Sequence, residues 1–154
     1  MSTLAEDEPL PDDPEIADED DLLRRVPNDP KLITRASDGT TRPSSAALTL
    51  RDGEVGCSVD ILGRLPDPGA PLTVLTGHDP NWGVATCTAG DARADQLHRV
   101  VGKPELGDEA HAEVIPTATT RKAQKRNFKA LAEKMTFLRD PVMAPPDVAV
   151  PTTE

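Results

Sequence analysis

The fold is decided by an alternating stretch of sequence, VGCSVDIL, at residues 55–62. Its apolar side chains recur at every second position: Val55, Cys57, Val59 and Ile61. Successive side chains of a strand point to opposite faces of a sheet, so these four share one face and Ser58 and Asp60 share the other. The stretch therefore predicts a half-buried β-strand.

Further strands are predicted on both sides of this one. Apolar runs bounded by turn residues mark strands at residues 46–50, 72–75, 83–88, 98–101 and 111–115, and residues 22–26 indicate a short strand or turn. Residues 51–54 contain Asp52-Gly53 and predict a hairpin connection. A short helical segment is expected at residues 89–97, with Asp91 as its N-cap. We expect an α+β domain with a small sheet of five or six mostly antiparallel strands.

One long helix is predicted at residues 121–138. Its apolar side chains are spaced three, four and three residues apart: Phe128, Leu131, Met135 and Leu138. Thr119 or Thr120 would cap its first turn, and Asp140-Pro141 would end it. The apolar stripe predicts a C-terminal amphipathic helix that covers one face of the sheet.

The net charge of the chain sits at its N-terminus. Residues 1–21 contain ten acidic side chains and no basic one, which equals the formal charge of −10 of the whole chain. Like charges repel, and this segment has few apolar groups to offset its ordering entropy. We therefore expect a disordered acidic arm at residues 1–21, a single domain at residues 22–139 and a disordered Pro-rich tail at residues 140–154.

The predicted helix is strongly basic, with seven Lys or Arg side chains against Glu133 between residues 121 and 139. The acidic arm could fold back onto it, the helix could bind an acidic partner, or the charges could form a solvated face. The body of the chain is not basic and lacks stacking aromatics, so we expect a protein partner and not nucleic acid. The candidate partner-binding residues are Arg121, Lys122, Lys125, Arg126 and Lys129.

Composition argues against several classes of protein. No run of about 18 apolar residues is present, so no membrane-spanning helix is expected. The N-terminus lacks the basic and apolar segments of a secretory signal. Cys57 and Cys87 do not form a disulfide framework, and no histidine or cysteine has the spacing of metal ligands. We therefore expect a cytoplasmic protein with no cofactor and no metal.

Residues that could carry chemistry are dispersed along the chain. The candidates are Arg25, Ser58, Asp60, His111 and Glu113. The guanidinium of Arg25 suits a carboxylate or phosphate because it donates in a planar fork. A purely structural role is the favoured alternative: a salt bridge between Arg25 and Asp60, with His111 as a hydrogen-bonding residue at a strand end. No phosphate-binding loop, serine hydrolase or zinc protease motif occurs.

An ordered set of short motifs runs through residues 22–115. They are Leu22-Leu23-Arg24-Arg25-Val26, Arg42-Pro43-Ser44-Ser45-x-Ala47, Cys57-Ser58-Val59-Asp60, Gly90-Asp91-x-Arg93-Ala94 and Gly107-Asp108-x-Ala110-His111-Ala112-Glu113-Val114. The set resembles a loose group of small, uncharacterised bacterial proteins, and the chain departs from it where Ala47 or Leu48 replaces an aromatic residue. The resemblance implies an organisation of the chain but no activity.

Two hypotheses of function follow. The leading one is a non-catalytic, cytoplasmic bacterial interaction protein that binds a partner through the acidic arm, the basic helix or both. The alternative comes from a resemblance to ADP-ribosyltransferase-like folds, whose clefts use an early-strand Arg, a later Ser-bearing strand and a late Glu. Arg25, Ser58 and Glu113 occur in that order, which implies an enzyme or a nucleotide-binding domain.

Overall fold

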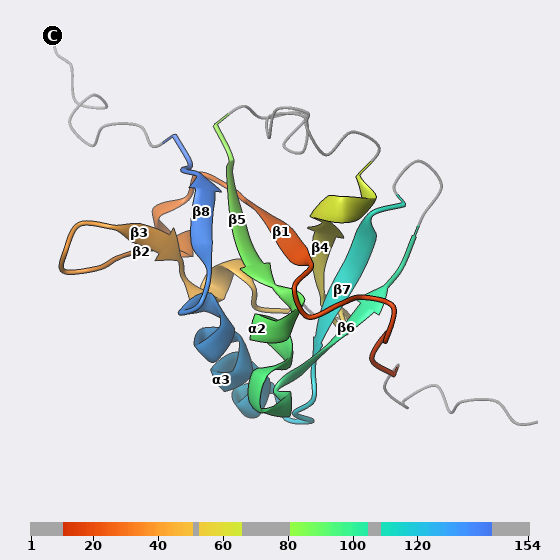
Figure 1. The fold of residues 1–154 in the computed structure, drawn as a ribbon. Coiled ribbons are helices and arrows are strands. Elements are labelled where there is room, and N and C mark those ends of the chain that lie inside the picture. Colours follow the sequence, from red (N-terminus) through yellow and green to blue (C-terminus); the bar gives the residue numbers. More distant parts are fainter. Residues whose placement is uncertain (1–10, 51–52, 66–80, 105–108, 143–154) are drawn as a thin grey trace, which may run out of the picture.

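The structure is a computed structural model that describes residues 11–50, 53–65, 81–104 and 109–142. Within them, six strands form one antiparallel sheet in the order β6-β7-β4-β1-β5-β8 (Figure 1). In chain order the strands are β1 (Asp21–Val26), β4 (Cys57–Ile61), β5 (Gly83–Thr88), β6 (His98–Gly102), β7 (His111–Pro116) and β8 (Thr136–Arg139). The prediction of an α+β fold with a mostly antiparallel sheet is confirmed.

β1 lies in the middle of this sheet, between β4 and β5. Leu22 stands opposite both Ile61 of β4 and Cys87 of β5, and all three side chains are buried. Residues 22–26, which the sequence left open as a strand or a turn, therefore form the central strand. The reason is that Leu22, Leu23 and Val26 are apolar enough to be buried on both faces of the sheet.

The strands predicted at residues 83–88, 98–101 and 111–115 are confirmed as β5, β6 and β7. The alternating stretch forms β4, and Cys57, Val59 and Ile61 are buried as expected. Val55 precedes the strand and is 59 % exposed, so the buried pattern begins two residues later than predicted. The strand expected at residues 72–75 lies outside the described residues.

The strand predicted at residues 46–50 is wrong. This segment contains a short 3₁₀ helix, η2 (Ser45–Ala47), in which Ala47 N donates to Ser44 O and Leu48 N donates to Ser45 O. The turn buries Ala47, Leu48 and Leu50 in the core. A short apolar run is compatible with a strand or a helical turn, so its pattern alone does not distinguish the two. Residues 51 and 52, which form part of the predicted hairpin connection, lie outside the described residues.

A separate hairpin forms from β2 (Ile33–Arg35) and β3 (Thr41–Pro43), and it lies beside β8 (Figure 1). Its connection contains Gly39 at φ +90°, a left-handed conformation that glycine adopts without steric cost. Thr41 Oγ1 donates to Asp140 Oδ1 at 3.1 Å, which attaches the hairpin to the residue that follows β8.

The helix predicted at residues 121–138 is too long. The helix α3 spans Arg121–Ala132, and β8 follows it. Phe128, Leu131 and Met135 are buried in the core cluster, as predicted, but Leu138 is 51 % exposed. In β8 the side chain of Phe137 packs against the core instead, and strand alternation turns Leu138 outward. Pairing with β5 thus overrides the helical spacing.

Each of the two described α-helices begins at a threonine cap. Thr120 Oγ1 accepts from Ala123 N at 3.2 Å at the start of α3, one of the two caps predicted. The helix α2 (Ala89–Arg93) begins at Thr88, which accepts from Asp91 N, while Asp91 accepts from Thr88 N. Asp91 is therefore the N3 residue of a capping box whose N-cap is Thr88, and not the N-cap predicted.

The N-terminal segment, residues 11–20, packs on the domain, so the expectation of disorder at residues 1–21 needs correction for its described part. Ile16 is 1 % exposed and belongs to the core cluster. Asp13 N donates to Val100 O at 2.9 Å, and Val100 N donates to Asp12 Oδ1 at 2.8 Å, which covers the edge strand β6. Asp21 is already part of β1. Residues 1–10 lie outside the described residues.

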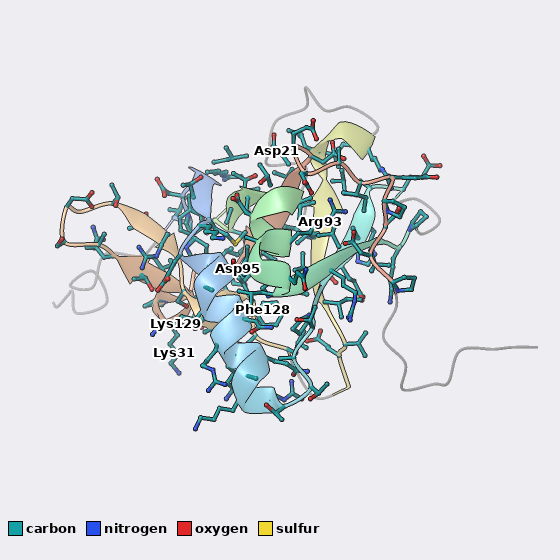
Figure 2. All side chains as sticks on the ribbon, turned by 60° about the horizontal axis from the view of Figure 1, so that its bottom comes forward. Asp21, Lys31, Arg93, Asp95, Phe128 and Lys129 are labelled. Carbon is teal, nitrogen blue, oxygen red and sulfur yellow. The ribbon has the colours of Figure 1, made fainter. Side chains whose placement is uncertain are left out.

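This acidic segment packs on the domain because Ile16 is buried in the core and the cation of Arg93 binds two of its carboxylates. Arg93 of α2 lies against the N-terminal segment (Figure 2) and donates to Asp12 Oδ1 at 3.0 Å and to Asp18 Oδ1 at 2.7 Å. Gly90 N also donates to Asp18 O at 2.8 Å. A side chain at Gly90 would place its Cβ only 3.2 Å from the backbone of Asp18, so glycine permits this approach.

At the other end, the Pro-rich tail expected at residues 140–154 is described only as far as Val142. Val142 N donates to Asn81 O at 2.8 Å, and Asn28 Nδ2 donates to Val142 O at 3.1 Å. These bonds attach the described start of the tail to the domain. Residues 143–154 lie outside the described residues.

Candidate functional site

Four of the five candidate chemical residues line one pocket of about 390 Å³: Arg25, Ser58, Asp60 and His111. Strand register explains their convergence. Asp60 of β4 stands opposite Leu23 of β1 and opposite His111 of β7. Because side chains two residues apart share a face of the sheet, Arg25 and Ser58 join this face. These four candidates are dispersed along the chain, but the pairing of β1, β4 and β7 brings them together.

The pocket opens where β1 and β4 separate. These two strands share two register pairs, Leu22 with Ile61 and Leu23 with Asp60, whereas β1 and β5 remain paired over six residues. The side chain of Arg24 spans the gap. Its Nε and Nη2 donate to Ala47 O at 3.1 and 3.0 Å, and its Nη1 donates to Ser58 O at 2.8 Å. The side chain of Arg24 thus connects β1 to β4 and to η2 where β1 and β4 form no further register pairs.

Glu113 is outside the lining of this pocket, although it stands opposite Ser58 in the pairing of β4 with β7. Its Oε1 lies 3.1 Å from Lys103 Nζ, and its side chain is 17 % exposed. The charge of Glu113 is therefore used in a local ion pair on the β6–β7 side of the sheet. The trio of Arg25, Ser58 and Glu113 shares a sheet face but not one pocket.

His111 is held at the edge of the pocket by its own strand end. Its Nδ1 lies 3.0 Å from Lys103 O, which fits a proton on Nδ1 and a hydrogen bond donated to the carbonyl. The neighbouring Asp60 is 7 % exposed. This arrangement provides an imidazole and a buried carboxylate from adjacent strands.

The sequence analysis does not select several pocket residues as site candidates. Arg24, Thr49, Glu54 and Trp82 also line the pocket. Arg24 stood beside Arg25 in the sequence, and its position in an otherwise apolar strand was the available signal. Trp82 gives no signal in the sequence. It lies near the site because the next residue, Gly83, pairs with Val26 at the end of β1.

The candidate partner-binding residues lie on a second surface. Arg121, Lys122, Lys125, Arg126 and Lys129 are all exposed on α3, and the opposite side of the helix is buried. Lys31 of η1 (Pro30–Leu32) is also exposed and lies on the same side of the molecule as Lys129 (Figure 2). Both η1 and α3 contact η2. We call these six residues the basic face.

The described part of the acidic segment does not meet this basic face. Asp12 and Asp18 form their ion pairs with Arg93 of α2. The hypothesis that the acidic arm folds back onto the basic helix is therefore wrong for residues 11–20.

The two cysteines do not supply a reactive thiolate. Both are buried and free. Burial raises the pKa of the Cys57 thiol, against a smaller opposing effect of the Arg24 cation, and burial raises the pKa of Cys87 to about 12. A thiol with a raised pKa stays protonated and is a poor nucleophile. Among the described residues, no His, Cys, Asp or Glu side chains gather in a group that could hold a metal ion.

No protein family model, curated protein or solved structure matches this chain. The resemblances to a group of small bacterial proteins and to ADP-ribosyltransferase-like folds therefore stay predictions. In the part of the chain that the structure describes, neither helix has the length and apolar character needed to cross a membrane.

Proposed function

We propose that this chain is a non-catalytic, cytoplasmic interaction protein that binds an acidic segment of a partner protein through the basic face. The observation that carries this proposal is the arrangement of charge on α3. Its cations recur at residues 121, 122, 125, 126 and 129, a spacing that keeps them on one side of a helix.

The basic face has charge to offer a partner. Arg121 Nη1 donates to Leu50 O at 3.3 Å, but the described salt bridges of the protein involve Arg93 and Lys103, not the lysines of α3. Exposed ion pairs contribute about 0.2–1 kcal/mol each, so several must act together to hold a partner. An acidic peptide segment can contact several of these cations along about two and a half helical turns.

The absence of a described exposed aromatic ring near the basic face favours a protein partner over nucleic acid. Phe128 is buried behind the basic face, and Phe137 packs against the core. No exposed aromatic ring is therefore described beside the basic face, and single strands usually stack their bases on such rings.

The test compares two charge-matched variants. One carries Lys122→Gln, Lys125→Gln, Arg126→Gln and Lys129→Gln, and leaves Arg121 unchanged because it bonds to Leu50. The control carries Arg35→Gln, Arg42→Gln, Arg64→Gln and Arg99→Gln on other elements. Fluorescence anisotropy measures binding of a labelled oligoglutamate peptide and of a DNA duplex, after circular dichroism confirms folding of both variants.

We expect the helix variant to bind the peptide at least about tenfold more weakly, a change of about 1.4 kcal/mol. The control should stay within about twofold of the unchanged chain, and binding should weaken as salt rises from about 50 to about 300 mM. Equal losses in both variants would contradict a specific basic face. Tighter binding to the DNA duplex than to the peptide would contradict a protein partner.

The alternative function, an enzyme or nucleotide-binding domain, is supported by one observation: Arg25 and Ser58 line the same pocket. Its third residue is less favourable, because Glu113 is paired with Lys103 outside the lining. Release of nicotinamide from NAD⁺ would measure this activity directly. If release occurs and Glu113→Gln abolishes it, the alternative replaces the proposed non-catalytic role.

A further inference from the structure

The pocket between β1 and β4 contains an arginine whose charge no described carboxylate meets. The three hydrogen bonds of Arg24 all go to backbone carbonyls, those of Ala47 and Ser58. Arg24 is half-buried and takes part in none of the described salt bridges. A partly desolvated cation whose hydrogen bonds go only to carbonyl oxygens attracts an anion more strongly than a fully solvated one.

The guanidinium also retains donors. An arginine side chain has five N–H groups in a planar fork. Three of them are used on Ala47 O and Ser58 O, which leaves one N–H on each terminal nitrogen of Arg24. Arg25 and Ser58 line the same pocket, and the Ser58 hydroxyl can add a further donor.

We infer that this pocket binds a small molecule through a carboxylate or phosphate group, held by Arg24, Arg25 and the Ser58 hydroxyl. The pocket volume of about 390 Å³ falls in the size range of small-molecule sites. Asp60 and Glu54 line the same pocket. Their carboxylates add hydrogen-bond acceptors to the lining, which suit a ligand that also presents hydroxyl or amine donors.

This inference is independent of the basic face. The pocket residues come from β1, β4, β7 and the segments around η2, with Leu32 from η1, Trp82 before β5, and Pro27 and Glu54 from connecting segments. No residue of α3 is part of the lining. A ligand here and a partner on α3 are therefore separable by mutation.

The test is a titration of the full chain with sodium phosphate and, separately, with sodium succinate at constant ionic strength. Backbone amide chemical shifts follow the site, and calorimetry gives the dissociation constant. We expect saturable shifts at residues 23–25 and 58–60 with at least one of the two anions. The anion that saturates identifies the group, phosphate or carboxylate, that the pocket prefers.

Variants assign the binding to the pocket. Arg25→Gln, at an exposed position that the core does not need, should weaken binding by about tenfold, or about 1.4 kcal/mol. Arg24→Lys, which keeps the charge but loses the planar fork, should weaken it as well. If Arg24→Lys does not fold, Ser58→Ala provides the second measurement.

Two controls make the inference falsifiable. Arg99→Gln removes a cation from β6, outside the lining, and should leave the dissociation constant unchanged. The helix variant described above should also keep its anion binding. Loss of binding in that variant would place the anion on α3 and overturn the pocket site, without contradicting the proposed protein partner. Absence of saturable shifts with both anions up to about 20 mM would also overturn it.

Discussion

Arg93 Nη1 on α2 donates to Asp18 Oδ1 at 2.7 Å, across 75 residues of sequence. The same guanidinium also donates from Nη2 to the backbone carbonyl of Asp13 at 2.9 Å. One half-buried cation thus converts acidic residues that would otherwise repel one another into a packed segment. The ion pairs and Ile16 together explain why residues 11–20 lie on the domain.

Arg93→Ala should destabilise the protein by about 1–2 kcal/mol, because it removes charge-assisted hydrogen bonds from partly exposed groups. Urea unfolding measures the change, and Arg99→Ala is the matched control. A loss of less than about 0.3 kcal/mol would show that the N-terminal segment is not held by this arginine.

Ile16→Ala should cost about 2–4 kcal/mol, since its side chain is 1 % exposed within the core cluster. The matched control is Val55→Ala, at a side chain that is 59 % exposed and should cost little. The same urea titration measures both. Equal stability of the two variants would restore the expectation of a disordered arm over these residues.

Leu131→Ala and Leu138→Ala distinguish the observed boundary of α3 from the predicted one. Leu131 is 3 % exposed and its truncation should cost about 2–4 kcal/mol, whereas Leu138 is 51 % exposed and should cost less than about 1 kcal/mol. A continuous helix to residue 138 would place both side chains on the buried stripe. Similar large losses for both variants would therefore contradict β8.

Acid should weaken the fold through His98. Its ring is 3 % exposed, Nδ1 lies 3.0 Å from Ala92 O, and the ring packs on Phe128 with centroids 5.1 Å apart. Burial lowers the pKa of His98 below its ordinary value of 6.5. The unfolded chain therefore takes up this proton first, and stability is lost as the pH falls below about 6.5.

His98→Asn removes this titrating group. Urea unfolding at about pH 7.5 and about pH 5.5 should show a smaller loss of stability for the variant than for the unchanged chain, because carboxyl groups titrate mostly below this window. An identical loss in both proteins would show that another group carries the acid sensitivity.

Much of the sheet could be predicted from local pattern. Alternation over β4 and the apolar runs of β5, β6 and β7 locate these strands, since period-two burial leaves a direct trace in the sequence. Residues 45–50 and 136–139 could not be assigned in this way. An apolar run such as Ala46–Leu48 fits a strand or a turn, and Phe137 enters a strand because the edge of β5 is available to it.

The candidate site divides in the same way. The sequence supplied the residue types, with Arg25, Ser58, Asp60 and His111 all named in advance. Their convergence depends on the pairing of Leu23 with Asp60 and of Asp60 with His111, contacts that no local pattern specifies. The role of Arg24 depends further on the separation of β1 from β4.

By itself, the sequence determined the alternating strands, the threonine cap of α3 and the basic character of that helix, because each depends on neighbours within a few residues. The tertiary structure alone decided which acidic residues are neutralised, where α3 ends and which polar side chains share a pocket. Those outcomes depend on contacts between residues far apart in the sequence, such as Asp12 and Val100, which are 88 residues apart. Such meetings follow from strand order and packing, which a single sequence does not encode locally.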